Sequence, residues 1–515
     1  MKRALILAIA SFVVGLEAAA ELQNVTIGGE LRIRGRYWSN VYAERGRETR
    51  IPDFFLPNRP IGPFGTDSLY TFDENGNARS RIEQSTKLRI SADFTDYVNA
   101  VVELDDFEVW GNDFRSDYRT GVDAAANSSD DVELLQSYIE TNETFGIPLR
   151  MRVGRQQLKL GNGWLVGETQ STLNISFDGL RLTYEGEGYA IDGWYTKLAE
   201  RGAVEEDGDV DFYGLSASCT AVEGHEFLVY WLYLRDATSL NDTNFAAPIE
   251  WLEDAFNLDD YGTTNLNTVG GSATGAFGPV DYLINVAYQF GDADNMGSLF
   301  KNNGMLYGDT DAEFGAWGSD AEIGYRFEDV AWTPRIYIGG AYYGGEDNRD
   351  ITFIEWLNPF DRPEASISFH RLFSSNRYYE FFDEGRNGTN FHQIRGGVVA
   401  QPTEKIEASL EVSKLGVNDT FDAPITVGIG EWRVPVAPAL SFLTESSGDD
   451  IGIVAALELT YQYSDELSFR FNWNHLFADD DVAEGNFIFG NGLEFMGGSS
   501  DDDLDYLNLE ARLKF

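Results

Sequence analysis

The segment that decides the fold lies at residues 504–515, LDYLNLEARLKF. Apolar side chains take every second position from Leu507 to Phe515, and polar or charged side chains take the positions between them, from Tyr506 to Lys514. A period of two is the period of a β-strand, in which successive side chains point to opposite faces. The segment therefore predicts a strand with one apolar face and one polar face.

The same alternation appears near the other end of the chain, where one face is charged. In residues 25–37, apolar residues and glycine alternate with a face that carries Glu30, Arg32, Arg34 and Arg36. A soluble sandwich also alternates, but the inward faces of its strands form a core and rarely carry several charges. A barrel that closes around water tolerates such charges inside while its outer face meets lipid. The pattern therefore favours an all-β transmembrane barrel.

Eighteen segments of this kind can be counted along the sequence. An even number of antiparallel strands is typical of single-chain bacterial barrels. The segments lie near 25–38, 79–94, 98–110, 131–142, 148–160, 173–185, 188–198, 210–219, 225–235, 265–275, 280–291, 313–327, 333–345, 389–401, 404–415, 450–463, 466–477 and 504–515.

The connections between the segments alternate in length. Tight connections occur at Thr95–Tyr97 and Gly186–Glu187. Short periplasmic turns and long extracellular loops give outer-membrane barrels this rhythm, which a soluble all-β protein does not need. The long connections, mostly after odd-numbered segments, are 39–78, 111–130, 236–264, 346–388, 416–449 and 478–503.

The N-terminus predicts export from the cytoplasm. Lys2 and Arg3 precede an apolar run at 4–16, and small residues follow it. This is the pattern of a secretory signal peptide, and the run is too short to span a membrane as a helix. Residues 1–20 are therefore predicted to be the signal peptide and residues 21–515 a single barrel domain.

Composition supports this class of protein and excludes others. Tyrosine (25), phenylalanine (35) and glycine (53) are abundant, as aromatic strands and tight turns require. The formal net charge of −47 argues against nucleic acid as a partner, and the single cysteine, Cys219, excludes an internal disulfide. The terminal Phe515 on an alternating strand resembles the sorting signal of the outer-membrane assembly machinery. That machinery and outer-membrane lipid are the expected partners, and the bacterial outer membrane is the expected location.

Basic side chains gather on the faces predicted to point into the barrel. Arginine is permanently charged and binds carboxylates through two parallel hydrogen bonds, so a ring of arginines in a pore concentrates anions, including carboxylated sugars. The alternative is a set of structural ion pairs with acidic residues such as Glu83 and Glu103, and both interpretations can hold for the cluster. The candidate substrate-binding residues are Arg32, Arg34, Arg81, Arg89, Arg150, Arg152, Arg155, Arg181 and Arg395.

Several short runs give the chain a resemblance to a known family. They are LLQSYI at 134–139, RVGRQ at 152–156, FDGLR at 177–181 and AYQFG at 287–291, with NPF at 358–360 in the insertion after the thirteenth segment. In order and spacing these runs resemble the bacterial alginate-export porin family over nearly the whole mature chain. The resemblance implies an eighteen-stranded barrel with an electropositive constriction that passes a polyuronate.

Two other kinds of site were considered. Asp207, Asp209 and Asp211 have the alternate spacing of a calcium loop, but the glycine and glutamate that complete such a loop are absent, so a solvated acidic loop is the alternative. Ser368 and His370 would share a face of a strand, as a nucleophile and its base might, but the sequence places no acidic residue beside them. We expect neither an enzyme nor a cofactor, apart from calcium at the acidic loops.

The expected function is diffusion without covalent chemistry. The barrel is predicted to pass an anionic polysaccharide, an alginate-like polyuronate or its oligomers, through an arginine-lined lumen. The alternatives are a general or cation-preferring porin for small solutes and an outer-membrane hydrolase. The acidic loop clusters Asp479–Asp481 and Asp501–Asp503 would suit the cation-preferring alternative.

Overall fold

The computed structural model describes most of the predicted strands and their shorter connections. Short strand pairs are also described within 423–445 and 487–496. The continuous described ranges are 22–39, 79–110, 132–170, 173–200, 209–237, 263–292, 313–345, 366–379, 388–419, 449–479 and 503–515. The predicted signal peptide at 1–20 lies outside them.

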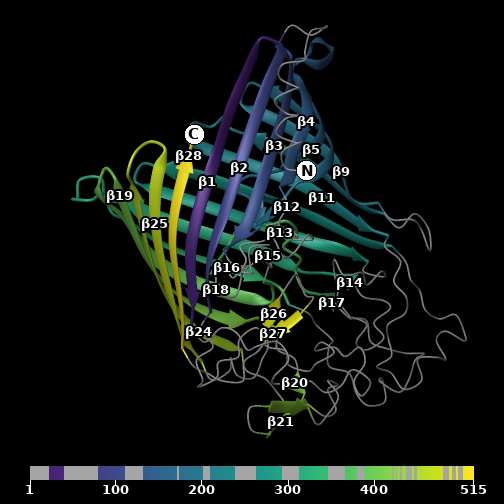
Figure 1. The fold of residues 1–515 in the computed structure, drawn as a ribbon. Coiled ribbons are helices and arrows are strands. Elements are labelled where there is room, and N and C mark those ends of the chain that lie inside the picture. Colours follow the sequence, from purple (N-terminus) through teal and green to yellow (C-terminus); the bar gives the residue numbers. More distant parts are fainter. Residues whose placement is uncertain are drawn as a thin grey trace, which may run out of the picture.

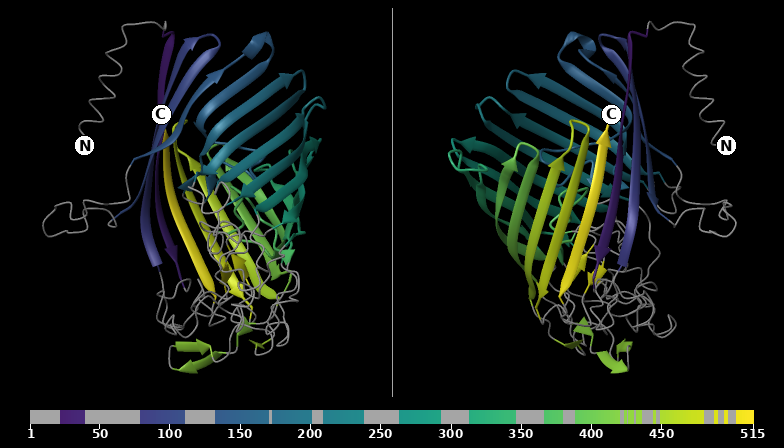
Figure 2. Two further views of the ribbon diagram at one scale, coloured as in Figure 1. Left: turned by 90° about the vertical axis from the view of Figure 1, so that its right-hand side faces the viewer. Right: turned by 60° about the vertical axis from the view of Figure 1, so that its left-hand side comes forward.

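Eighteen antiparallel wall strands form one closed barrel (Figures 1 and 2). Each wall strand pairs with the next in chain order, and β28 (Leu504–Lys514) pairs with β1 (Asn24–Trp38) to close the sheet. The predicted all-β barrel and its strand number are confirmed. The other wall strands are β2 (Arg79–Thr95), β3 (Val98–Val109), β4 (Glu133–Thr141), β5 (Leu149–Gln156), β8 (Phe177–Gly186), β9 (Tyr189–Ala199), β10 (Val210–Cys219), β11 (His225–Asp236), β12 (Thr264–Phe277), β13 (Val280–Asp292), β15 (Trp317–Arg326), β16 (Arg335–Tyr343), β18 (Phe391–Thr403), β19 (Ile406–Val417), β24 (Asp450–Gln462) and β25 (Leu467–Ala478).

Shorter elements accompany the wall. β14 (Glu313–Phe314) pairs with β13 and, in parallel, with β17 (Ser366–Ile367). A 3-10 turn, η1 (Thr144–Gly146), joins β4 to β5. Among the described residues no helix is long and apolar enough to cross a membrane. The remaining short strands pair two by two: β6 (Thr169–Gln170) with β7 (Leu173–Asn174), β20 (Ala423–Pro424) with β23 (Thr444–Glu445), β21 (Thr426–Ile429) with β22 (Trp432–Pro435), and β26 (Phe487–Phe489) with β27 (Glu494–Met496).

Alternation sets the two faces of the wall. On β1, Arg36 and Trp38 are buried, whereas Tyr37 between them is exposed. Burial follows the inward position because neighbouring wall and lumen side chains cover it, and outward apolar side chains are left to face lipid. Tyr195 and Tyr213 form part of an outward aromatic ladder, with their ring centroids 5.1 Å apart. Such ladders mark the membrane interface in outer-membrane barrels.

The described short turns lie at one end of the barrel. Thr95 pairs with Val98 across the β2–β3 turn, and Gly186 pairs with Tyr189 across the β8–β9 turn. The end of the wall that carries these turns is stepped, because β1 and β2 extend farther than β28 (Figures 1 and 2). Short turns identify this end as periplasmic.

Candidate functional site

Two segments between wall strands fold back into the barrel, and we call them the inner segments. The first inner segment is residues 157–168, between β5 and β6, and the second is residues 368–379, after β17. Their large side chains are buried: Trp164 is 2% exposed and Phe369 is fully buried. Apolar residues in a connection are hidden here because the barrel itself surrounds them.

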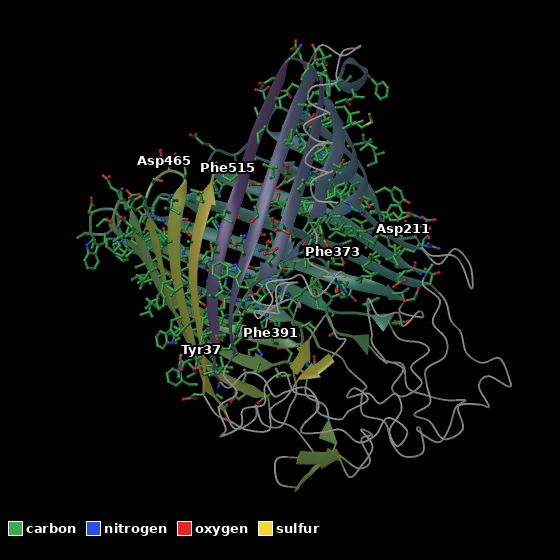
Figure 3. All side chains as sticks on the ribbon, in the orientation of Figure 1. Tyr37, Asp211, Phe373, Phe391, Asp465 and Phe515 are labelled. Atoms are coloured by element: carbon green, nitrogen blue, oxygen red, sulfur yellow. The ribbon has the colours of Figure 1, made fainter. Side chains whose placement is uncertain are left out.

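Aromatic contacts tie both inner segments to the wall. Phe373, labelled in Figure 3, contacts the inward rings of Phe177 on β8 and Phe212 on β10, at centroid distances of 5.0 and 5.1 Å. The Trp164 indole N–H donates to the Tyr343 hydroxyl on β16, 2.7 Å away. A buried indole that finds its acceptor adds direction to the apolar packing.

The two inner segments are also joined to each other. Val166 and Phe373 form a parallel bridge, and the Gly163 carbonyl accepts a hydrogen bond from the Ser375 N–H at 3.0 Å. Glycine is required at 163 and 167, because a Cβ atom at either position would collide with the Ser375 side chain. The pair therefore forms a single cross-linked unit.

Gln289 of β13 fastens the second inner segment through its backbone. Its amide donates to the His370 carbonyl and accepts from the His370 N–H, both at 2.7 Å. His370 Nδ1 accepts from the Leu372 N–H at 3.0 Å, and within the described residues no hydrogen bond joins Ser368 Oγ to the His370 ring. Both side chains are buried under the inner packing, so the hydrolase alternative has no accessible nucleophile and base.

Asp320 of β15 is the polar centre of this contact. Arg395 of β18 pairs with it at 2.8 Å, and Tyr378 and Asn376 of the second inner segment donate to it at 2.9 and 3.1 Å. Burial raises the pKa of the Tyr378 hydroxyl, so this group stays protonated and remains a donor. Arg395 also pairs with Glu322, so this predicted substrate-binding residue is already engaged by two carboxylates of the wall.

Across the lumen lies a different surface, which we call the basic wall: the inward faces of β25, β28, β1 and β2. Among the side chains that the structure describes there, nine are basic and four are acidic. The basic ones are Arg32, Arg34, Arg36, Arg81, Lys87, Arg89, Arg470, Arg512 and Lys514. The acidic ones are Glu30, Glu83, Asp93 and Glu510.

The opposite wall has the reverse balance. On β13, β15, β16, β18 and β19 the described inward side chains include five carboxylates and three arginines. They are Asp281, Asp320, Glu322, Glu407 and Glu411, with Arg326, Arg335 and Arg395. The inward faces of the wall strands are therefore positive on one side of the lumen and negative on the other.

Several ion pairs of the basic wall converge on one buried carboxylate. Glu83 alone binds three guanidinium groups, those of Arg34 at 2.6 Å, Arg36 at 3.1 Å and Arg81. Arg32 makes no ion pair with any described residue, although it is only partly exposed. The described side chains of this wall include nine basic and four acidic ones, so their net charge attracts anions.

Arg512 strengthens the same surface. It stands directly opposite Arg32 in the β1–β28 register, on the same face, and pairs with Glu510 at 3.1 Å. Like charges opposite one another on a sheet repel. A bound carboxylate between the two guanidinium groups would relieve this repulsion. Arg89 pairs with Glu103 at 3.0 Å.

Three predicted arginines of β5 and β8 are each matched by one carboxylate. The pairs are Arg150–Glu185 at 2.8 Å, Arg152–Glu140 at 2.6 Å and Arg181–Asp192 at 2.6 Å. Arg152 and Arg181 are direct cross-strand neighbours, so a row of two cations is flanked by two anions. This row is close to neutral, and it fits the structural ion-pair alternative.

Arg155 corrects the sequence prediction, because it lies on the outer face of the wall. It stands opposite Asp178 and pairs with it at 2.7 Å, while Phe177, one residue away on the same strand, is buried inward. Arg155 is three positions from Arg152, so the strand period of two already places the two side chains on opposite faces, and the register of β5 with β8 is regular through this stretch. The prediction was wrong in assigning both arginines to the lumen.

The candidate calcium ligands are only partly described. Asp207 lies outside the described residues, and Asp209 and Asp211 both pair with Lys197, whose ammonium supplies the positive charge. In the described part of the chain, no group of three or more histidine, cysteine or acidic side chains is placed to hold a metal ion.

Sequence reasoning missed the inner segments and Arg512. The run GNGWLVG at 161–167 carried a signal, because a connection rich in glycine with buried-type side chains suits a tightly packed loop. Arg512 was on the polar face of the last predicted strand, and closure of the barrel brings that strand beside β1.

A closed barrel of eighteen strands with a charged lumen defines the molecule as an outer-membrane channel. The chain belongs to the Alginate export family, whose profile matches residues 64–486. Among solved structures, OccAB1 of Acinetobacter baumannii is similar over 97% of this chain and 98% of its own, at 11% identity and a TM-score of 0.51. OccK8 (OprE) of Pseudomonas aeruginosa is similar over 96% and 99% of the two chains, at 11% identity and a TM-score of 0.48. No curated protein matches the sequence.

These findings decide several predictions. The family resemblance, the outer-membrane location and the assignment as a channel are confirmed. The hydrolase alternative is wrong, since the Alginate export family consists of non-enzymatic channels.

Proposed function

We propose that this channel passes a carboxylate-bearing polyanion, an alginate-like polyuronate or its oligomers, by diffusion along the basic wall. The observation that carries the proposal is the excess of basic over acidic side chains among those described on this wall, where Arg32 makes no ion pair with any described residue. The predicted arginines that contribute are Arg32, Arg34, Arg81 and Arg89, joined by Arg36 and Arg512. Four other predicted arginines are each paired with a carboxylate and contribute mainly to the local electrostatic potential: Arg150, Arg152, Arg181 and Arg395.

The physical argument rests on the local balance of charge. A fully paired arginine offers little net attraction, whereas a surface with more cations than carboxylates attracts a polyanion along its length. The inner segments occupy the opposite side of the lumen, so a passing chain would be held near the cations. Conduction along such a surface requires no conformational change.

A planar-bilayer recording tests the proposal. We expect added oligouronate to block the ion current of the native channel, and neutral dextran of equal size not to block it. In Arg32→Gln the apparent affinity of the block should fall about tenfold, the effect of losing one charge-assisted contact. Arg155→Gln, which removes an arginine from the outer face, should change it less than about twofold. Equal block by both polymers, or equal effects of both substitutions, would contradict the proposal.

One observation favours a second candidate, a cation-preferring porin for small solutes. The formal net charge of the chain is −47, and its acidic clusters fall in the predicted loops. Reversal potentials in a salt gradient separate the candidates, because the basic wall predicts anion preference and dominant loop carboxylates predict cation preference.

We also propose that residues 1–20 direct export and are removed, leaving 21–515 as the barrel. The assembly machinery would then read the alternating strand that ends in Phe515. Substituting Phe515 by Gln should reduce the heat-modifiable, folded fraction in outer-membrane preparations, and an unchanged fraction would contradict this role.

A further inference from the structure

At the stepped periplasmic rim, part of one edge of β1 has no partner strand among the residues that the structure describes. β1 pairs with β2 along its whole length, from Asn24 to Trp38. Its register with β28 covers only Glu30 to Trp38, with one further hydrogen-bonded pair at Gly29. Among the described residues, none pairs with the other edge of residues 24–28.

The alternation of hydrogen bonds shows which groups are left over. Gly29 exchanges both of its backbone hydrogen bonds with Phe515, at 2.8 and 3.1 Å. In an antiparallel ladder every second residue directs its N–H and C=O to the same side. Val25 and Ile27 therefore point theirs to the side that β28 would occupy if it continued. Four backbone groups have no partner there among the described residues.

The side chains at this edge are as exposed as its backbone. Ile27 is 65% exposed and Val25 is 45% exposed, and both are on the outer face. Asn24 and Thr26 occupy the inward positions. An unpaired edge of this kind is a template for another strand.

The open edge is five residues long, about 17 Å of strand. We infer that this edge binds an extended peptide segment of a periplasmic protein by strand addition. The added segment would alternate apolar residues beside Val25 and Ile27 with polar residues beside Asn24 and Thr26. This is the general mode in which main-chain hydrogen bonds give affinity and alternate side chains give selectivity. The inference does not depend on what the channel passes.

The position of the edge argues against a second copy as its occupant. The edge points along the circumference, into the step above the end of β28, and not outward from the wall (Figures 1 and 2). Two upright barrels in one membrane would meet at their outer walls before these edges could meet. A single extended segment fits the step, because it continues the line of β28.

Binding of a synthetic peptide tests the inference on the purified full-length protein in detergent. The probe is a fluorescein-labelled heptapeptide of alternating valine and threonine with a terminal lysine. In Ile27→Pro, which removes an N–H from the open edge and leaves the β2 ladder intact, affinity should fall at least about tenfold. Ile27→Ala keeps the N–H and should bind within about threefold of the native protein.

Three outcomes would overturn the inference. They are no binding of the probe to the native protein, equal binding to Ile27→Pro, and a native dimer that Ile27→Pro converts to monomer. Val25→Pro serves as the second edge variant if Ile27→Pro does not fold. In addition, amide exchange at residues 25 and 27 should slow at least about tenfold when the probe is bound, and unchanged exchange would count against strand addition.

Discussion

The inner segments and the basic wall face each other across one lumen and follow opposite rules. The second inner segment makes close polar contacts with the wall: Gln289 satisfies the backbone of His370, and Asp320 accepts from Tyr378 and Asn376. On the basic wall three arginines share Glu83. The comparison separates a buried polar contact, which holds a shape, from a surface with an excess of basic side chains, which attracts anions.

The largest expected effect comes from breaking the rigid side. Asp320→Ala removes the acceptor that joins the second inner segment to the wall and leaves Arg395 with Glu322 alone. Loss of one member of a buried charged network costs about 3 kcal/mol of unfolding free energy. We expect a lower thermal midpoint in detergent and a larger, noisier single-channel current, because the inner segment is released.

Asp281→Ala is the matched control for this change. Asp281 also binds an arginine of the same wall, Arg335, but that arginine keeps Glu322 at 2.9 Å and touches no inner segment through this pair. Its current should match that of the native channel. A quiet, unchanged current in Asp320→Ala would show that the inner segments do not depend on this acid.

A smaller effect is expected from the neutral row on β5 and β8. Arg152→Gln with Arg181→Gln leaves Glu140 and Asp192 without their cations, so the lumen gains two uncompensated negative charges. The cation-to-anion permeability ratio should rise about fivefold, equivalent to about 1 kcal/mol in the pore. Reversal potentials in a potassium chloride gradient measure it. A native ratio that already favours cations and does not respond would remove the basis for polyuronate passage.

The sequence predicted the wall well because each strand carries its own signal. Alternation in residues 25–37 and 504–515 placed Arg32, Arg34 and Arg512 on one face, and barrel closure only had to bring the ends together. The assignment of Arg155 to the lumen was wrong because it departed from this alternation, which places residues 152 and 155 on opposite faces.

The inner segments could not be predicted in the same way. Their structure depends on contacts between residues about two hundred positions apart, as between Val166 and Phe373. Nothing in the local sequence of either segment determines the partner. For the same reason the ion pairs of Arg395 with Asp320 and Glu322 were invisible, although each residue was correctly placed on a strand.

The smallest effect is expected from the acidic cluster in the predicted loop at 478–503. Neutralising Asp479, Asp480 and Asp481 together removes three charges from the predicted loop at 478–503. Exposed charges act through water and salt, and at about 0.15 M ionic strength their field decays over about 8 Å. The permeability ratio should therefore change less than about twofold at that salt, although three charges are removed and not two.

At about 0.01 M the decay length grows to about 30 Å, and the loop substitutions should then approach the effect of the Arg152 and Arg181 pair. Measuring both variants at both salt concentrations distinguishes the regions directly, because side chains screened by the lumen wall respond weakly to salt and loop side chains respond strongly. If the loop variant dominates at high salt as well, the acidic loops govern selectivity, and the channel is better described as a cation-preferring porin.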